Sequence, residues 1–283
     1  QVDPIEKKPF FHVFPGCGAL SFGMLGCNFK CPFCQNWISS QVLRDPASTG
    51  QIEEIGPDAL VDIAIGAGAP VIVSTYNEPL ITSDWAALIF EKACERGLTC
   101  GYVSNGHATP EVLNFLRPFM SLYKVDLKCF NDDHYRTLGG RLNVVLDTIV
   151  TLKARGYWVE VVTLVVPGFN DDNAELKQMA EFIAGVSVDI PWHVTAFHPM
   201  YKMTDARATT PGDLERAYTA GKEAGLRYVY AGNLPGRVAN GENTRCGYCD
   251  ELLIERHGYM IRSNRMLGGC CPQCHTPVPG VWR

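Results

Sequence analysis

The sequence predicts an α/β protein built on a parallel, partial β/α barrel of six to seven units, with a small C-terminal metal-binding ribbon. Short apolar, strand-like segments alternate with amphipathic helical segments, as in right-handed βαβ units. Polar residues recur directly after the strand-like segments, and in a parallel barrel those positions share the face where active sites form. Two C-x2-C pairs near the C-terminus predict the ribbon.

The first half of the chain contains the first predicted β/α units. Residues 1–17 are rich in proline and are expected to be irregular. Helices are predicted to begin at Pro57, Ser83 and Pro110, because proline favours the first helical position and serine the N-cap. Apolar and β-branched composition predicts strands at residues 19–25, 71–75 and 98–104.

The second half continues the same alternation. Helical segments are predicted to end near Gly156, to span residues 174–184, and to run from Pro211 to Gly225. Strands are predicted at residues 122–127, 158–166, 193–197 and 227–231. These elements assign residues 1–235 to the barrel and residues 236–283 to the ribbon.

Composition limits the class of protein. With 283 residues, 46% of them hydrophobic, the chain can form one large domain and a small appendage. The balance of 25 Lys+Arg against 30 Asp+Glu argues against a strongly cationic nucleic-acid-binding protein, although a local basic patch is compatible with it. Without a run of eighteen apolar residues, no membrane span is predicted. Twelve cysteines, several of them in a triplet and two pairs, indicate metal chemistry in a reducing, cytoplasmic compartment.

The most specific motif is the C-x3-C-x2-C triplet of Cys27, Cys31 and Cys34. Its thiolates can bind three irons of a 4Fe-4S cluster, and no fourth cysteine lies at a suitable distance along the sequence. One iron is therefore predicted to stay open for a ligand. A zinc knuckle or a set of buried thiols is the alternative, but structural zinc normally takes four ligands.

This triplet, with Phe33 before its last cysteine, resembles the signature of the radical S-adenosylmethionine (radical SAM) superfamily. Gln35-Asn36-Trp37 resembles the branch of the pyruvate formate-lyase activating enzymes. Within that branch the chain is similar to the radical SAM member of the AmmeMemoRadiSam gene system. Members of that group usually carry a further cysteine-containing segment upstream, so a segment before Gln1 is expected. The similarity covers residues 3–9, 75–79, 126–128 and 232–236 and the C-terminal cysteines.

The resemblance implies that the amino and carboxylate groups of S-adenosylmethionine bind the open iron, and that reductive cleavage yields a 5′-deoxyadenosyl radical. Cys27, Cys31 and Cys34 are then the catalytic, cluster-binding residues. The cofactor-binding residues that the resemblance implies are Phe33, Asn77, Glu78, Ser104, Asn105, Asp126, Lys128 and His198.

Two of these matches differ from the family motif or have an ordinary alternative. Glu78 matches the acidic residue of a Gly-Gly-Glu motif that binds the methionine ammonium, but Tyr76-Asn77 replaces the two glycines. Ser104-Asn105-Gly106 matches a Thr-Asn-Gly motif that contacts the cofactor. Without the family, Glu78 would be a solvated residue at a helix start and the Asn-Gly pair a simple turn.

Three further matches follow predicted strands. Strand alternation places Asp126 and Lys128 on one face. The resemblance assigns Lys128 to the cofactor carboxylate or the substrate backbone, and His198 to the cofactor. The alternatives are a surface ion pair of little energy and a structural histidine.

The C-terminal cysteine pairs predict a second metal site. About twenty residues separate the pairs, a spacing typical of zinc-ribbon and rubredoxin-like knuckles. Four thiolates form a closed, structural tetrahedral site that suits zinc or iron. The predicted ligands are Cys246, Cys249, Cys271 and Cys274, and Cys270 could replace Cys271.

The predicted function is hydrogen abstraction from a partner polypeptide, like that of a glycyl-radical activating enzyme. The resemblance also implies an electron donor of the flavodoxin or ferredoxin type. Two alternatives stay open: a radical SAM enzyme acting on a small molecule or nucleotide, and a non-catalytic iron–sulfur and zinc-binding module. A mildly basic ribbon face is predicted to dock an acidic partner through Arg245, Arg256, Arg262 and Arg265; the alternative is that the ribbon only caps the barrel.

Overall fold

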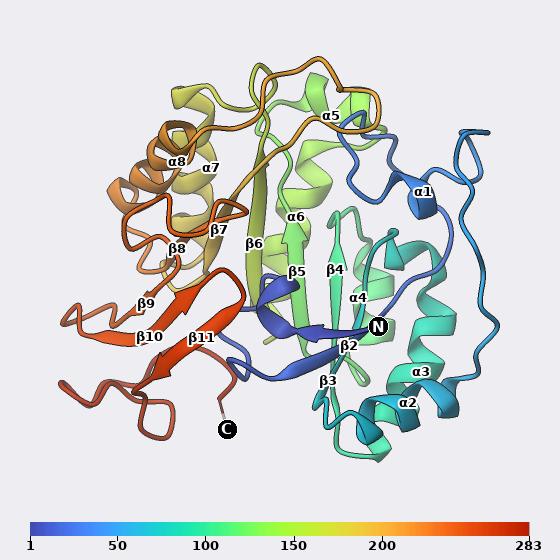
Figure 1. Cartoon of the computed structure of the whole chain (residues 1–283), viewed down its shortest axis with the longest axis horizontal. Coiled ribbons are helices and arrows are strands. Elements are labelled where there is room, and N and C mark those ends of the chain that lie inside the picture. Colours follow the sequence, from blue (N-terminus) through green and yellow to red (C-terminus); the bar gives the residue numbers. More distant parts are fainter. Residues whose placement is uncertain (283) are drawn as a thin grey trace.

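The computed structural model describes residues 1–282 and contains a β/α core with the ribbon beside it (Figure 1). Within these residues, eight strands form the main sheet in chain order, and β2 to β8 run parallel. The strands are β1 Val2–Pro4, β2 Gly18–Phe22, β3 Val71–Ser74, β4 Thr99–Ser104, β5 Leu122–Asp126, β6 Trp158–Val165, β7 Trp192–Ala196 and β8 Val229–Gly232. Strands β1 and β8 form the two edges, so the sheet is the partial barrel that the sequence predicted.

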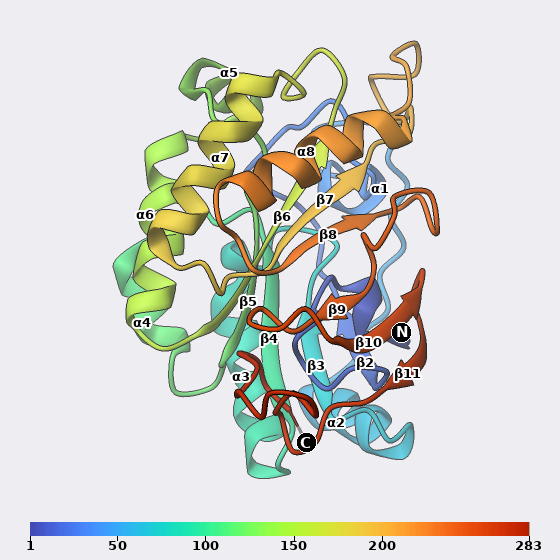
Figure 2. The same cartoon turned by 90° about the vertical axis from the view of Figure 1, so that its left-hand side faces the viewer.

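Helices connect the parallel strands, and Figure 2 shows α4, α6 and α7 along one side of the sheet. They are α1 Trp37–Ser40, α2 Pro57–Gly66, α3 Ser83–Glu95, α4 Pro110–Leu116, α5 Asp132–Leu138, α6 Leu142–Ala154, α7 Asn173–Val186 and α8 Pro211–Glu223, with 3-10 turns η1 Ile5–Lys7 and η2 Pro79–Thr82. Side-chain caps explain several starts: Thr109 accepts from the N–H of Val112, and Thr210 forms a capping box with Asp213. Among residues 1–282, the helices are too short or too polar to cross a membrane.

The amino-terminal segment is the main correction to the predicted elements. Residues 1–17 were expected to be irregular, but Val2–Pro4 pairs antiparallel with Gly18–Leu20 of β2 and a 3-10 turn follows. A three-residue strand that ends in proline has no recognisable alternation. Its pairing depends on the exposed edge of β2, which only the assembled sheet provides.

The ribbon is a small antiparallel sheet that shares a hydrophobic core with the barrel. Its strands are β9 Thr244–Arg245, β10 Leu252–His257 and β11 Met260–Asn264. Leu253 and Ile254 of β10 belong to one hydrophobic cluster with Phe11. Tyr230 of β8 and Tyr228, which directly precedes β8, complete that contact. Figure 1 shows β9 to β11 beside the edge strand β8 and the amino-terminal segment. The ribbon is therefore packed against the barrel through a shared hydrophobic cluster.

One predicted docking residue belongs to this contact. Arg256 of β10 is 4% exposed, and its guanidinium donates to the carbonyl of Phe11 at 2.8 Å and to the hydroxyl of Thr244 at 2.6 Å. The prediction that Arg256 faces a partner is wrong, because the barrel buries it. Arg262 and Arg265 are exposed and stay candidates.

Candidate functional site

The polar residues that follow the parallel strands line a common cavity of about 100 Å³. They belong to the loops after β2, β3, β4 and β5, whose carboxyl ends meet at one edge of the sheet. The lining includes Cys27, Cys31, Cys34, Asn77, Glu78, Ser104, Asn105, Asp126 and Lys128. We call this space the cysteine cavity. A wider cavity of about 350 Å³ shares Cys31, Cys34, Asp126 and Lys128 with it.

The cysteine loop leads from β2 into α1. Gly26 turns the backbone with a φ of +97°, a conformation that a side chain would strain, and Cys27 follows directly. Cys31 is buried, whereas Cys27 and Cys34 are half-buried. Burial raises the pKa of the Cys27 thiol to about 12 and that of Cys31 to about 11. Three thiols around one polar cavity fit the donor set of a 4Fe-4S cluster with one open iron.

Glu78 links the loops after β3 and β4. Its side chain is 2% exposed, and Oε1 accepts from the hydroxyl of Ser104 at 2.7 Å and from the N–H of Leu80 at 3.1 Å. Oε2 accepts from the N–H of Asn105 at 2.7 Å. The amide of Asn105 donates in turn to Asn28 of the cysteine loop at 2.7 Å. The solvated-residue interpretation of Glu78 is wrong, because the carboxylate is buried and hydrogen-bonded.

Tyr76 and Gly106 both have left-handed backbone conformations, although only Gly106 is the glycine of the motif that it matches. Tyr76, in place of a motif glycine, adopts a left-handed φ of +73°, which costs a non-glycine residue about 1–2 kcal/mol. Its hydroxyl accepts from Lys8 at 2.8 Å, and Lys8 also donates to Asp3 at 3.2 Å. At Gly106, with a φ of +72°, a Cβ would lie 2.6 Å from Val125. The loop after β3 therefore keeps the glycine-like turn, and its tyrosine joins the amino-terminal segment to the site.

Asp126 carries two lysine partners at the end of β5. Lys128 donates to it at 3.1 Å, and Lys124, 5% exposed, also pairs with it. Burial alone would raise the pKa of Asp126, but Lys124 and Lys128 outweigh it and hold the pKa at about 2. The ion pair is partly buried in the cavity wall, so the surface-pair interpretation is wrong. Sequence reasoning missed Lys124, although the alternation that links residues 126 and 128 also points to residue 124.

The burial of Glu78 predicts a pH dependence of stability. Burial raises its pKa from 4.5 to about 7, so the folded chain retains a proton that the unfolded chain releases near pH 4.5. Stability should therefore fall between about pH 4.5 and 7, by about 3 kcal/mol for this group. Urea unfolding of the cluster-free protein should show that loss in wild type but not in Glu78→Gln. Parallel pH profiles for the two proteins would contradict the assignment.

Phe33 and His198 do not line the cysteine cavity. Phe33 lines the wider cavity, and its ring packs against that of Phe169 with centroids 5.2 Å apart. His198 is exposed and lines an adjoining cavity of about 440 Å³, which shares Gln35 and Asn233 with the wider one. His198 does not line the cysteine cavity itself, and its cofactor role stays a prediction.

The four predicted ribbon cysteines converge. Their sulfur atoms lie within 4.8 Å of one another, with Cys246–Cys274 and Cys249–Cys271 sulfur distances of 3.6 Å. Tetrahedral zinc with bonds of about 2.3 Å places its sulfurs about 3.8 Å apart, so this group fits a metal ion. Cys270 is not part of the group.

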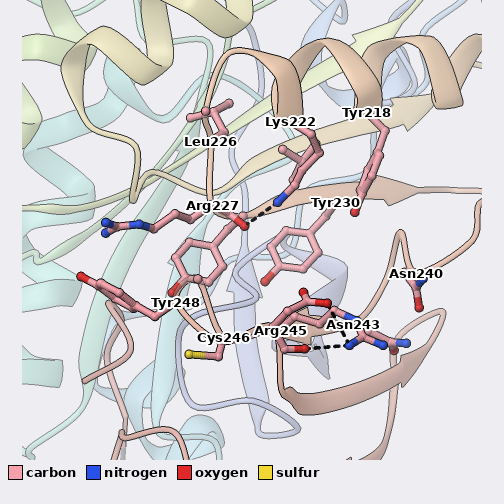
Figure 3. A pocket seen from close by; sticks show the side chains of 15 residues that line it. Tyr218, Lys222, Leu226, Arg227, Tyr230, Asn240, Asn243, Arg245, Cys246 and Tyr248 are labelled. Carbon is pink, nitrogen blue, oxygen red and sulfur yellow. Dashed lines mark hydrogen bonds and ion pairs between the residues drawn. The ribbon is translucent and has the colours of Figure 1, made fainter. Parts of the chain in front are cut away.

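A separate cavity of about 550 Å³ lies between α8 and the ribbon. Figure 3 shows Tyr218 and Lys222 on the helix above it, and Tyr248 and Arg245 on the ribbon side. Lys222, in the last turn of α8, donates to the carbonyl of Arg227 in the segment that follows the helix, at 3.1 Å. The cavity beside α8 is remote in sequence from the cysteine loop, and none of the nine residues named for the cysteine cavity lines it.

Comparison with known proteins agrees with the geometry. The family described as the Radical SAM superfamily matches residues 23–183. The chain is 37% identical over 257 residues to an uncharacterized protein of Methanocaldococcus jannaschii. The aligned region covers 90% of this chain and 75% of that protein. The chain is 27% identical over 233 residues to the pyruvate formate-lyase-activating enzyme of Staphylococcus aureus, with coverages of 74% and 88%.

Solved structures share the fold at low sequence identity. Streptococcus suis SuiB bound to S-adenosylmethionine gives a TM-score of 0.58 at 12% identity over 80% of this chain and 52% of SuiB. SuiB bound to its precursor peptide SuiA gives 0.56 at 14% identity over 80% and 50%. This chain therefore corresponds to about half of SuiB.

Proposed function

Because the chain belongs to the radical SAM superfamily, we propose that it reductively cleaves S-adenosylmethionine and abstracts hydrogen from a partner polypeptide. The observation that carries the proposal is the cysteine cavity, where the cysteine triplet and the polar ends of three further strands meet. Membership of this superfamily implies a 4Fe-4S cluster and S-adenosylmethionine. It also favours an enzyme over a non-catalytic metal-binding module.

In this proposal the cysteine loop holds the cluster through Cys27, Cys31 and Cys34. When bound, and reduced by an external electron donor, the cluster would supply the one electron that splits the cofactor into methionine and a 5′-deoxyadenosyl radical. Glu78 accepts a hydrogen bond from the methionine ammonium, since an ionised carboxylate has about four acceptor sites. Lys128, oriented by Asp126, donates to the cofactor carboxylate.

Four of the remaining predicted residues complete the pocket. Asn77, Ser104 and Asn105 hold the loops in place, because they hydrogen-bond to Met24, Glu78 and Asn28 respectively. Phe33 offers an apolar surface for the adenine in the wider cavity. These contacts orient the sulfonium and exclude water from the reacting carbon.

A polypeptide substrate is supported by the relatives. One is an activating enzyme for pyruvate formate-lyase, and SuiB has been solved with a precursor peptide. A small molecule or nucleotide is the second candidate, because the wider cavity of about 350 Å³ lies in the size range of small-molecule pockets. A flavodoxin- or ferredoxin-type electron donor and the specific similarity to the AmmeMemoRadiSam member stay predictions.

The test is anaerobic reconstitution with iron, sulfide, a reductant and S-adenosylmethionine. We expect 5′-deoxyadenosine, and deuterium transfer into it when a true partner polypeptide carries deuterated glycine. Absence of 5′-deoxyadenosine from the cluster-loaded protein would overturn the whole proposal. Transfer only from a metabolite or nucleotide would overturn the polypeptide substrate and retain the radical chemistry.

A further inference from the structure

Besides the cysteine triplet and the ribbon cysteines, a further group of metal-ligating side chains lies near the end of the sheet that carries the cysteine cavity. Cys129 directly follows Lys128 after β5, His134 lies on α5, and Glu175 lies on α7. One potential ligand atom of each lies within 4.8 Å of the other two. Three separate elements therefore bring a thiol, an imidazole and a carboxylate to one point.

The hydrogen bonding of this group is incomplete. Within residues 1–282, Nδ1 of His134 is buried and has no hydrogen-bond partner. The fully buried Cys129 thiol donates only weakly to the carbonyl of Asn131, at 3.5 Å. An unpartnered buried nitrogen costs about 1–3 kcal/mol, and native structures normally supply a protein, water or ion partner. A bound ligand would give the buried nitrogen of His134 the partner that the protein does not supply.

Neighbouring contacts hold two of the three side chains in place. Oε1 of Glu175 accepts from the N–H of Phe130 at 2.6 Å. The His134 ring stacks on Phe169, with centroids 4.8 Å apart and planes at 20°. Contacts of this kind orient ligating carboxylates and imidazoles around metal ions.

A direct ion pair does not account for the arrangement. The described residues form no hydrogen bond or ion pair between His134 and Glu175, although their ligand atoms lie within 4.8 Å. Ligands of a tetrahedral ion with bonds of about 2.0–2.3 Å lie about 3.3–3.8 Å apart. Ligand atoms that lie within 4.8 Å of one another without a direct hydrogen bond or ion pair between His134 and Glu175 leave room for an ion between the side chains.

We propose that Cys129, His134 and Glu175 bind a divalent transition-metal ion, for which zinc is the best match. Thiolate and imidazole favour zinc over magnesium or calcium, whose preferred ligands are oxygen atoms. Three protein ligands leave a fourth position for water. On binding, the Cys129 thiol releases its proton to solvent and the thiolate coordinates the ion.

The ion has a structural consequence for the cysteine cavity. It ties the loop after β5 to α5 and α7, next to Lys128, whose carbonyl accepts from Asn170 at 2.6 Å. Phe169 contacts both the His134 ring and the Phe33 ring. The ion therefore positions the cavity wall that carries Lys128.

The test counts metal ions in the full-length, cluster-loaded protein by mass spectrometry after anaerobic equilibration with zinc. Wild type should hold one ion in addition to the cluster iron and the ion of the ribbon cysteines. His134→Ala and Cys129→Ala should each lose that ion and keep the other metals. Cys100→Ala removes a thiol in β4 that is 1% exposed and outside the group, so it should match wild type.

Two further measurements separate this site from the ribbon. Cobalt substitution should give thiolate-to-metal absorption in Cys246→Ala/Cys274→Ala, and His134→Ala should abolish it in that background. Added zinc should raise the melting temperature of wild type and Cys100→Ala more than that of His134→Ala. His134 is half-exposed on its helix, so this variant decides the question if Cys129→Ala does not fold.

Two results would overturn the proposal: no ion in wild type beyond the cluster and ribbon metals, or an additional ion that persists in both single variants. The readouts need no cleavage of S-adenosylmethionine. Failure of the proposed function and failure of this site are therefore distinguishable.

Discussion

Replacing Cys31 by alanine is expected to reduce 5′-deoxyadenosine formation to the level of a protein-free control. Cys31 is 7% exposed and lines both the cysteine cavity and the wider cavity. Loss of its thiolate leaves the loop with two cluster ligands, Cys27 and Cys34, where a cluster of this type needs at least three. Without a cluster no electron reaches the cofactor, so the loss should be complete. Iron and sulfide per chain, together with chromatography of the reaction, measure both steps.

The matched control for this variant is Cys100→Ala, which removes another buried thiol, 1% exposed, from β4. It should retain both the cluster and the activity. A chain lacking Cys27, Cys31 and Cys34 together that still formed 5′-deoxyadenosine would refute the proposed function. Loss of activity in Cys100→Ala as well would show that the assay reports general damage to the core.

Removing Cys246 and Cys274 together is expected to release the ribbon metal and unfold residues 240–283. The effect should be large, because structural zinc contributes about 10–16 kcal/mol of apparent binding free energy in small peptides at pH 7. Tyr228 and Tyr230 share the ribbon's hydrophobic cluster, so loss of protection should spread to β8. Hydrogen exchange by mass spectrometry would map this spread.

The control here is Cys270→Ala, because Cys270 neighbours the site but is not part of the four-sulfur group. It should keep the metal and the exchange pattern of wild type. Iron at the cysteine triplet should survive in the double variant, since no ribbon cysteine lines the cysteine cavity. Cluster loss in that variant would mean that the two metal sites depend on each other.

Much of the fold could be predicted because the signals are local. Alternating apolar segments, proline at helix starts and glycine at helix ends placed most element boundaries within three residues of those in the structure. The predicted ligands at Cys27–Cys34 and in the two C-x2-C pairs are also local signals, since each motif depends on spacing within a few residues. Strand-end polarity even predicted which residues share a cavity, because parallel strands bring their carboxyl ends to one edge.

The same local signals failed where a neighbour comes from a distant element. Arg256 appeared to be a surface charge, yet Phe11 and Thr244 bury its guanidinium. Lys8 and Tyr76 meet at the cavity although 68 positions separate them.

The sequence by itself indicated the candidate thiols for a cluster, the four ribbon cysteines that converge in the structure, and the parallel β/α sheet. Only the tertiary structure decided which charges are buried and what they contact. It turned Glu78 into a buried link between two loops, and it brought together Cys129, His134 and Glu175 from three elements. The physical reason is that ligand spacing and strand alternation are properties of a short segment. Which side chains are buried, and which groups they contact, depends on how the amino-terminal segment and the ribbon pack against the whole sheet.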